Sequence, residues 1–343
     1  MVPVRRGSAV GTNAISGVGR ANGTTGYSMV DCHPRREDIL HEVVTGLTNM
    51  PKHLPPKLLY DPKGSALFDA ITRQPEYYLT RYELSILSSI GDDMRSLMSP
   101  DTVIVELGSG SGEKTIHLLN MLPEATAYIA VDISVSALNS ALSSLAVQFP
   151  SKHLIGMVAD YLAPFVLPSS FENMPKLFVF FGSTLGNFEP LDAVHFLNDM
   201  ALSLKPHDAL LVGIDLKKTP ELIHRAYNDA AGVTAEFNYN VLARINRDCS
   251  ANFTLEYFRH EAEYQSDAGR VAMFLVSEKE HTVTVADYDV HFDVGEPITT
   301  EYSYKYSIEE FYSLAYQAGW SIDQSWTDTD EMFSMHYLRP DLV

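Results

Sequence analysis

Residues 102–115 read TVIVELGSGSGEKT, and this stretch decides the fold. Its β-branched and apolar run at 102–107 is typical of a buried strand. Three glycines at alternate positions, Gly108, Gly110 and Gly112, follow directly. Glycine allows a sharp turn and a close approach to a ligand because it has no side chain. The stretch therefore predicts a strand that leads into a ligand-binding loop.

Further apolar runs lie on both sides of longer segments with helical spacing. This alternation predicts a parallel sheet that is covered by helices on both faces. The five predicted strands are TVIVEL at 102–107, AYIAVD at 127–132, LIGMVA at 154–159, KLFVFFG at 176–182 and ALLVGID at 209–215.

The pattern changes after residue 215. A helical stretch at 220–230 precedes β-rich runs between 271 and 294, which indicates a second, inserted domain. A helical stretch at 308–318 and two final runs, SIDQSWT and MFSMHYL, predict a helix and an antiparallel hairpin that return to the first sheet. The predicted fold class is therefore α/β, a Rossmann-like sheet with an inserted α+β domain. Its predicted division is 36–215 with 306–343 for the first domain and 216–305 for the inserted one.

The first 30 residues contain no acidic residue and are rich in Gly, Ser, Asn and Thr. Such a composition cannot bury enough apolar area to offset the entropy of ordering, so we predict a flexible tail over 1–35. An acid-poor start with three arginines also resembles an organellar transit peptide, although no amphipathic helical stripe accompanies it. Apolar residues at helical spacing predict the first packed helix over 36–47.

Composition narrows the range of partners. The chain has 343 residues, 45% of them hydrophobic, which is enough for a large core. Its 25 Lys and Arg against 44 Asp and Glu give a net charge of -19, which repels a phosphate backbone and predicts no nucleic-acid partner. No apolar run reaches the roughly 20 residues of a membrane span. Cys32 and Cys249 form no CxxC pair, so we expect a reducing, cytoplasmic location. We also expect a monomer.

Three kinds of nucleotide-binding loop compete for the glycine-rich stretch. A Walker A loop has Gly directly before its Lys, whereas Glu113 precedes Lys114 here. The dinucleotide fingerprint of dehydrogenases is G-x-G-x-x-G, whereas this loop reads G-x-G-x-G. The form ELGSGSG resembles motif I of class I S-adenosylmethionine-dependent methyltransferases. On this loop alone a dehydrogenase stays open.

Two acidic residues end the next strands. Asp132 follows the second predicted strand, where a carboxylate can accept hydrogen bonds from both ribose hydroxyls. Asp160 follows the third, where it can accept from an adenine amine while Tyr161 packs nearby. Either Asp alone is equally typical of a helix cap. Together, at the carboxyl ends of successive strands, they favour a nucleotide-like cofactor.

Several long strings resemble the histidine-specific methyltransferase family, whose best-known members make the trimethylated betaine of histidine on the way to ergothioneine. The resemblance covers roughly residues 36–340. The strings are LPPKLLYDPKGSALFDAIT at 54–72, PEYYLTRYE at 75–83, ELGSGSGEKT at 106–115, FVFFGSTLGN at 178–187, RAYNDAAGVTAEFNYNVLARINR at 225–247 and TEYSYKYS at 300–307.

The resemblance implies roles for matching residues. It implies S-adenosylmethionine as the cofactor, bound by Gly108, Ser109, Gly110, Lys114, Asp132, Asp160 and Tyr161. It implies a substrate pocket formed by Phe68, Tyr77, Gly182, Asn187, Tyr227, Met273, Glu301 and Ser303, in which Asn187 and Tyr227 bind the amino-acid backbone and Glu301 and Ser303 the imidazole. Tyr60 and Tyr77 are the predicted catalytic residues, because aromatic walls tolerate a growing ammonium group through cation–π contacts.

The residues themselves agree with these roles. Asn and Tyr donate hydrogen bonds to a carboxylate without adding charge near the sulfonium. In the alternation TEYSYKY, a strand places Glu301, Ser303 and Lys305 on one face, which supplies an acceptor and a hydroxyl that can donate or accept for the two imidazole nitrogens. The same alternation also occurs on solvated strand faces. No HExxH or Cys/His ligand spacing is present, so we predict no metal.

The function predicted from the sequence is S-adenosylmethionine-dependent methylation of the α-amino group of L-histidine, to the trimethylated betaine hercynine used in ergothioneine biosynthesis. Two alternatives stay open. One is an Nα-methyltransferase for another aromatic amino acid such as tryptophan. The other is a non-catalytic cofactor-binding subunit.

Overall fold

The computed structural model describes residues 26–32, 36–110 and 112–341. Within them, the largest element is an eight-stranded sheet with the order β1-β5-β4-β3-β6-β7-β14-β13. All neighbours from β1 to β7 are parallel, and β14 pairs antiparallel with both β7 and β13. The strands are β1 (Tyr27–Asp31), β3 (Val103–Leu107), β4 (Ala127–Asp132), β5 (His153–Val158), β6 (Lys176–Phe180), β7 (Ala209–Asp215), β13 (Trp320–Thr327) and β14 (Phe333–Pro340).

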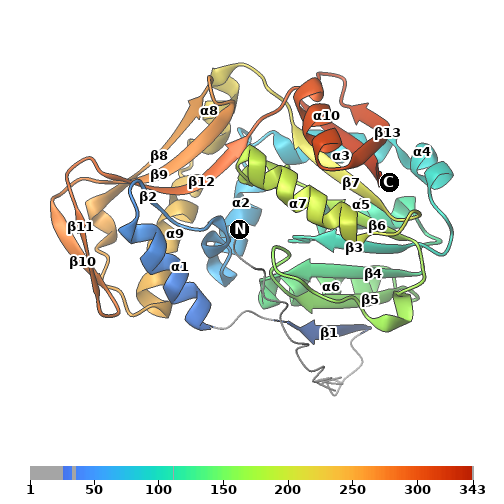
Figure 1. Ribbon diagram of the computed structural model, residues 1–343, viewed down its shortest axis with the longest axis horizontal. Helices are drawn as coiled ribbons and strands as arrows, with labels where there is room; N and C mark the ends of the chain where they lie inside the picture. Colours follow the sequence, from blue (N-terminus) through green and yellow to red (C-terminus); the bar gives the residue numbers. More distant parts are fainter. Residues whose placement is uncertain (1–25, 33–35, 111, 342–343) are drawn as a thin grey trace, which may run out of the picture.

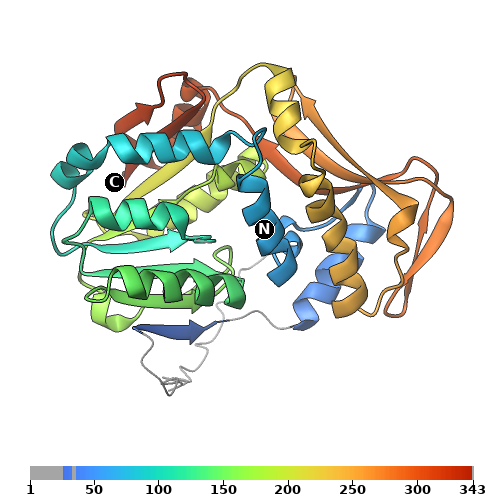
Figure 2. The ribbon, with the colours of Figure 1, turned by 180° about the vertical axis from the view of Figure 1, so that it is seen from behind.

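Helices cover both faces of this sheet, as Figures 1 and 2 show. Alternate residues of each strand face opposite sides, so Ile104 joins one core and Val103 and Val105 the other. On the first side lie α3 (Leu79–Ser89), α4 (Gly91–Leu97), α5 (Glu113–Met121) and α6 (Val135–Gln148). On the second side lie α7 (Pro190–Ser203) and α10 (Ile308–Gln317).

The predicted α/β fold with a Rossmann-like sheet is confirmed. All five predicted strands form within a residue or two of their predicted ends, and the final helix and antiparallel hairpin return to the sheet. The order reverses at β3, whose neighbours β4 and β6 are reached in opposite directions. Ligands of open α/β sheets bind at the carboxyl ends of the strands at such a point.

A second unit lies beside the large sheet (Figure 1). It contains a four-stranded sheet of order β2-β12-β9-β8, a β10-β11 hairpin and helices that pack against them. Its strands are β2 (Lys52–His53), β8 (Phe258–Gln265), β9 (Arg270–Ser277), β10 (His281–Val285), β11 (Tyr288–Phe292) and β12 (Pro297–Tyr304). Its helices are α8 (Pro220–Tyr227) and α9 (Val233–Asp248), with the short 3₁₀ helices η1 (Pro56–Leu59) and η4 (Leu255–Tyr257). Two further 3₁₀ helices, η2 (Ser169–Phe171) and η3 (Thr184–Asn187), precede and follow β6 of the large sheet.

Residues before the glycine loop also contribute to this second unit. Strand β2 pairs parallel with β12, and α2 (Pro62–Thr72) packs against α9. Helix α1 (Arg36–Thr48) contacts β2 and β11. The predicted division, which assigned all of 36–215 to the first domain, did not include these contacts.

The prediction of a flexible tail over 1–35 is wrong for β1. Tyr27–Asp31 adds a parallel edge strand to β5, and the Tyr27 hydroxyl donates to Asn139 Oδ1 at 3.1 Å. Met29 fits over Gly156, where an added Cβ would lie 2.4 Å from its sulfur. Composition missed this strand because two inward-facing side chains are enough to seat a short edge strand. Residues 1–25 and 33–35 of the predicted tail lie outside the described residues.

Candidate active site

Two cavities adjoin at the boundary between the large sheet and the second unit. We call them the inner pocket and the outer cavity; they enclose about 480 and 850 Å³, including their openings to solvent. The inner pocket is lined by Tyr60, Phe68, Ile71, Tyr77, Gly182, Thr184, Asn187, Ala226, Tyr227, Thr234, Phe237, Met273, Glu301 and Ser303. Every residue predicted for the substrate and for catalysis is in this set. Tyr60 lines both cavities, so it lies at their junction.

One part of the inner pocket is aromatic. The Tyr60 ring packs edge-on against Phe68 and Phe237, with ring centroids 5.6 and 5.5 Å apart. Phe68 also contacts Tyr77 at 6.3 Å. The four rings come from four segments. Tyr60 follows η1, Phe68 lies in α2, Tyr77 precedes α3 and Phe237 lies in α9. Such a group of π faces suits a cationic ligand group.

The phenols of this aromatic group are free to contact a ligand. Among the described residues, neither the Tyr60 nor the Tyr77 hydroxyl has a hydrogen-bond partner. Burial raises the pKa of each phenol well above its usual value, and the nearby Glu301 carboxylate and neighbouring tyrosines add to the effect. Both side chains therefore stay neutral, as hydrogen-bonding groups rather than bases.

The polar part of the pocket comes from β12. The register against β9 shifts between Thr299 and Glu301, which leaves Thr300 in a bulge with its hydroxyl donating to the Met273 carbonyl. A bulge redirects the side chains that follow it. Here Glu301 lies opposite Met273, and Glu301 and Ser303 both reach the pocket, as the predicted alternation required.

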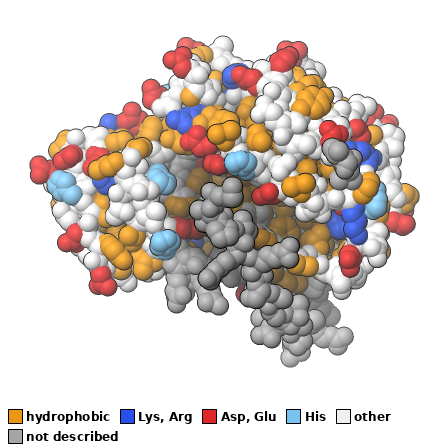
Figure 3. Space-filling view, viewed as in Figure 1, with side chains coloured by type: hydrophobic (Ala, Val, Ile, Leu, Met, Phe, Trp, Pro, Cys, Tyr) orange, Lys and Arg blue, Asp and Glu red, His pale blue; other side chains and the backbone are white. Residues whose placement is uncertain are grey.

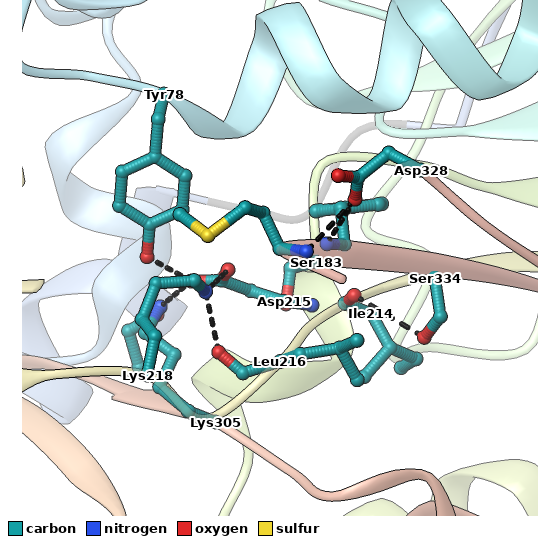
Figure 4. A network of polar contacts seen from close by, with 12 residues as sticks. Tyr78, Ser183, Ile214, Asp215, Leu216, Lys218, Lys305, Asp328 and Ser334 are labelled. Atoms are coloured by element: carbon teal, nitrogen blue, oxygen red, sulfur yellow. Dashed lines mark hydrogen bonds and ion pairs between the residues drawn. The ribbon is translucent and has the colours of Figure 1, made fainter. Parts of the chain in front are cut away.

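A buried charge network surrounds Lys305, the residue that directly follows β12 (Figure 4). The Lys305 ammonium lies 2.8 Å from Asp215 Oδ2 at the end of β7, and both side chains are fully buried. Asp215 also pairs with Lys218 at 2.5 Å and accepts from the Tyr78 hydroxyl at 2.9 Å. Burial opposes ionisation of Asp215, but the two ammonium groups hold its pKa below its usual range.

Glu301 is the electrostatically unusual group of the pocket. Burial raises its pKa to about 7, and the Lys305 charge partly opposes that rise. Its direct partner is the Asn187 amide, which donates to Oε2 at 3.4 Å. Asn187 ends η3, which follows β6, so the large sheet and the second unit meet at this contact. Near neutral pH the Glu301 side chain is therefore close to the balance between its ionised form, a hydrogen-bond acceptor, and its protonated, neutral form.

The outer cavity lies beside the glycine loop. Gly108, Gly110 and Gly112 have φ of 71°, 52° and 79°, a left-handed backbone that favours glycine. Apart from its two chain neighbours, no described atom lies within 4 Å of a Cβ built at Gly110, so the described residues leave space there. Asp132 accepts from the backbone amides of Gly110 at 3.2 Å and Ser134 at 2.8 Å, and Ser134 lines the cavity.

The predicted adenine-side residues lie on the same cavity or next to it. Asp160 lines it, accepts from the Leu162 amide and pairs with Lys57 at 3.1 Å. Tyr161 packs edge-on against Phe180 and lies 3.8 Å from a Cβ built at Gly108. The lining residues of the outer cavity are Ile39, Glu42, Lys57, Leu58, Tyr60, Asp61, Pro62, Ile133, Ser134, Val135, Ser136, Asp160, Arg244, Arg247 and Asp248.

Lys114, which follows the glycine loop, is linked to the inner pocket through a residue that sequence analysis missed. Its ammonium pairs at 2.6 Å with Glu83 of α3, which is fully buried. Glu83 also accepts from the Gly182 amide at 2.8 Å, and Gly182 lines the inner pocket. Glu83 stands in the quoted PEYYLTRYE string and is the fifth residue of α3, where a Glu is equally typical of an ordinary solvated helix face. Its burial could not be read from that pattern.

Other contributors also lacked a clear sequence signal. Phe237 and Thr234 lie on α9 within a quoted string, and their helical spacing is the same as that of core residues. Asp215 and Lys305 are 90 positions apart, so their pairing follows only from the fold. No group of three or more His, Cys, Asp or Glu in the described part of the chain is placed to hold a metal ion. None of the described helices is long and apolar enough to cross a membrane.

Comparison with known proteins gives a consistent result. The sequence model of the family described as "Histidine-specific methyltransferase, SAM-dependent" matches residues 39–340. The chain is 40% identical to a histidine N-alpha-methyltransferase of Mycolicibacterium smegmatis, over 85% of this chain and 92% of the relative. It is 38% identical to the protein of that name from Mycobacterium tuberculosis, over 84% and 90%. A 4-dimethylallyltryptophan N-methyltransferase of Claviceps purpurea is 28% identical, over 85% and 92%.

Proposed function

Because the chain belongs to the histidine-specific, S-adenosylmethionine-dependent methyltransferase family, we propose that it methylates the α-amino nitrogen of L-histidine. One observation carries the proposal. A pocket with an aromatic group, a carboxyl acceptor and a serine hydroxyl adjoins the cavity beside the glycine loop, and Tyr60 lines both. That pocket matches a substrate with an amine at one end and an imidazole at the other.

The outer cavity suits S-adenosylmethionine. Open space beside Gly110 leaves room for a ligand close to the backbone, and Asp132 offers carboxylate oxygens at the end of β4. Asp160 and Tyr161 suit the adenine end, and Lys114 suits the carboxylate end. When bound, the cofactor supplies a methyl group on a positively charged sulfur.

The inner pocket suits histidine. Glu301 accepts from one imidazole nitrogen and Ser303 contacts the other, while Asn187 and Tyr227 bind the backbone end. In the structure Asn187 donates to Glu301 and the Tyr227 hydroxyl donates to Ser303. Asn187 has a second N–H for the substrate carboxylate. Tyr227 keeps its proton on Ser303 and contacts the backbone end through its oxygen, whose second lone pair can accept from the amino group.

Methyl transfer requires a neutral amine in line with the sulfonium methyl group, so the enzyme gains most from alignment and exclusion of water. The neutral Tyr60 and Tyr77 phenols orient the amine and a water that takes its proton. The rings of Tyr60, Phe68 and Phe237 accommodate each added methyl through cation–π contacts. Repeated transfer then gives the trimethylated betaine hercynine, the precursor for ergothioneine.

Histamine tests the backbone end of this proposal. Because it lacks the carboxylate, it leaves the second Asn187 N–H without a ligand partner, and we expect it to be a poor substrate. The measurement is methyl transfer to histidine and histamine at equal concentration. Equal rates would refute the assignment of Asn187 to the substrate carboxylate.

The 28% identity to a tryptophan-derivative N-methyltransferase supports a second candidate, an Nα-methyltransferase for another aromatic amino acid. The buried Glu301 and Ser303 argue against it, because neither an indole nor a phenyl ring has a ring acceptor for the Ser303 proton, and a phenyl ring has no donor for Glu301 either.

We further propose that the enzyme acts as a monomer in the cytoplasm and binds no nucleic acid. Cys32 and Cys249 are free thiols, which suits a reducing compartment. Acidic side chains are spread over the face in Figure 3, in keeping with the net charge of -19.

A further inference from the structure

Lys305 is a buried cation whose three hydrogen bonds are all used within the protein. Its Nζ lies 2.8 Å from Asp215 Oδ2, from the Tyr227 hydroxyl and from Ser303 Oγ. An ammonium group has three protons, so these partners use its full capacity. Burial alone would lower the pKa of Lys305, but Asp215 and Tyr227 raise it above its usual value. The group therefore stays charged.

These contacts fix the direction of the next hydrogen bonds. Ser303 Oγ accepts from Lys305 and also from the Tyr227 hydroxyl, at 2.8 Å each. Both lone pairs of the serine oxygen are then occupied. Its own proton has no acceptor among the residues that the structure describes, and Ser303 lines the inner pocket. The Ser303 hydroxyl can therefore offer a ligand a proton, and no lone pair.

We propose that Lys305 is a positioning residue for substrate selection: held by Asp215, it makes Ser303 a hydrogen-bond donor to the substrate ring. The inference rests on the proposed function. Glu301 is the acceptor of the pair and Ser303 the donor. Together they select a ring with one N–H, which donates to Glu301, and one bare nitrogen, which accepts from Ser303. That ring is a neutral imidazole in a single tautomer, and the doubly protonated imidazolium is excluded.

Lys218 provides a matched control. It is a second buried ammonium on the same carboxylate, 2.5 Å from Asp215 Oδ1, and it lies over the Tyr78 ring at 4.5 Å. It makes no contact with Ser303 or Tyr227 among the described residues. Each lysine can be replaced by Met while the other still pairs with Asp215. Lys305→Met and Lys218→Met therefore both remove one buried charge. Only Lys305→Met also removes a hydrogen-bond donor to Ser303.

Analogues of histidine separate donor from acceptor contacts. Thiazol-4-ylalanine and thiazol-5-ylalanine place one bare nitrogen at either imidazole nitrogen position and have no N–H, whereas thienylalanine has neither. The experiment measures kcat and KM for these compounds and histidine with the wild type, Lys305→Met, Lys218→Met and Ser303→Ala. Calorimetry with S-adenosylmethionine checks that each variant still binds the cofactor.

We expect the wild type to prefer one thiazolylalanine over thienylalanine by about tenfold, the effect of one hydrogen bond, and mainly through KM. Lys305→Met and Ser303→Ala should each abolish that preference, and Lys218→Met should keep it. The inference is overturned if neither thiazole isomer is preferred by the wild type. It is equally overturned if Lys305→Met keeps the preference or if Lys218→Met loses it too. A wild type that does not methylate histidine would instead reject the proposed function.

Discussion

Glu301 and Ser303 are two residues apart on β12, and the bulge at Thr300 brings both into the inner pocket. A buried polar pair of this kind discriminates strongly, because a ring without nitrogen gives the Ser303 proton no acceptor and Glu301 no ring N–H. Phenylalanine and leucine should therefore be rejected relative to histidine by roughly 10⁴-fold in kcat/KM. Tryptophan should be rejected on size as well.

Replacing Glu301 by Ala removes the acceptor and opens space beside Met273. Histidine should lose about 10- to 150-fold in kcat/KM, the worth of a charge-assisted hydrogen bond, while activity on tryptophan rises. Kinetics with both substrates for the wild type and Glu301→Ala measure the change. An unaltered preference would mean that another part of the protein contacts the imidazole.

The ionisation of Glu301 predicts an acidic limb in the pH profile. Because burial raises its pKa to about 7, its carboxylate gains a proton and loses its acceptor role as the pH falls through about 7. The groups whose charges interact with it are Lys305, Tyr60, Tyr77 and Tyr161, and burial keeps the three phenols neutral in this range. Activity on histidine should therefore decrease toward acid.

Free histidine titrates nearby, with an imidazole pKa of about 6.5, so the slope separates the two groups. The α-ammonium and the imidazolium of free histidine each have to lose a proton in either protein, so they contribute equally to both slopes. Below the pKa of Glu301, log kcat/KM for the wild type should fall by one more for each pH unit than it does for Glu301→Gln. Equal slopes in both proteins would remove Glu301 as the titrating group.

Asp132 is the residue that tests the cofactor site. Asp132→Ala should weaken S-adenosylmethionine binding by about 2 kcal/mol, because a carboxylate acceptor for hydroxyl groups is lost. Asp132→Asn keeps an oxygen for the Ser134 amide and is the control for damage to the loop. Calorimetry with both variants measures the affinity. Unchanged affinity in Asp132→Ala would defeat the assignment.

At the scale of elements, the loop after β3 predicts a difference between two glycines. Gly110 and Gly232 both have left-handed φ, 52° and 72°, and at both an added Cβ meets no atom of the described residues within 4 Å apart from the chain neighbours. Each Gly→Ala change should cost roughly 1–2 kcal/mol of stability from backbone strain alone. Only Gly110→Ala places a methyl group in the space proposed for the cofactor.

Cofactor affinity should therefore fall in Gly110→Ala and stay unchanged in Gly232→Ala, at similar losses in thermal stability. Thermal unfolding and calorimetric titration of the two variants provide the comparison. If both variants bound S-adenosylmethionine as the wild type does, the space beside Gly110 would not be the binding site.

Sequence patterns were sufficient for the elements that are buried on both faces. Strand β3 is apolar except for Glu106, and such short runs have few alternatives when a glycine loop follows. Strand β1 was missed because its flanking composition is that of a tail, and only Tyr27 and Met29 pack inward. The bulge at Thr300 left no signal either, since Thr is an ordinary strand residue.

At the scale of the molecule, the site is assembled from segments that are far apart in the chain. Glu83, Lys114 and Gly182 meet in one buried contact, and Asp215 meets Lys305 in another. The strings that resemble the family contain most of these residues, and so the pocket residues were predictable as a set. Their pairings were not, because a charge in a sequence carries no information on its partner across the fold.

The two units are joined directly beside the proposed cofactor site. Lys57 lies in η1, which packs against α9 of the second unit. It pairs with Asp160, which follows β5 of the large sheet. The same Asp160 is the proposed adenine acceptor. Binding of S-adenosylmethionine and the relation between the two units are therefore linked through one carboxylate.

The central claim, methylation of the histidine α-amine, is tested most directly by mass spectrometry of a single incubation. The purified protein is mixed with S-adenosylmethionine carrying a deuterated methyl group and all twenty amino acids, and fragmentation locates the label. The account predicts labelled methyl groups on the α-nitrogen of histidine, and on no other amino acid at a comparable rate. Label on the imidazole, on another amino acid in preference to histidine, or on none would contradict it.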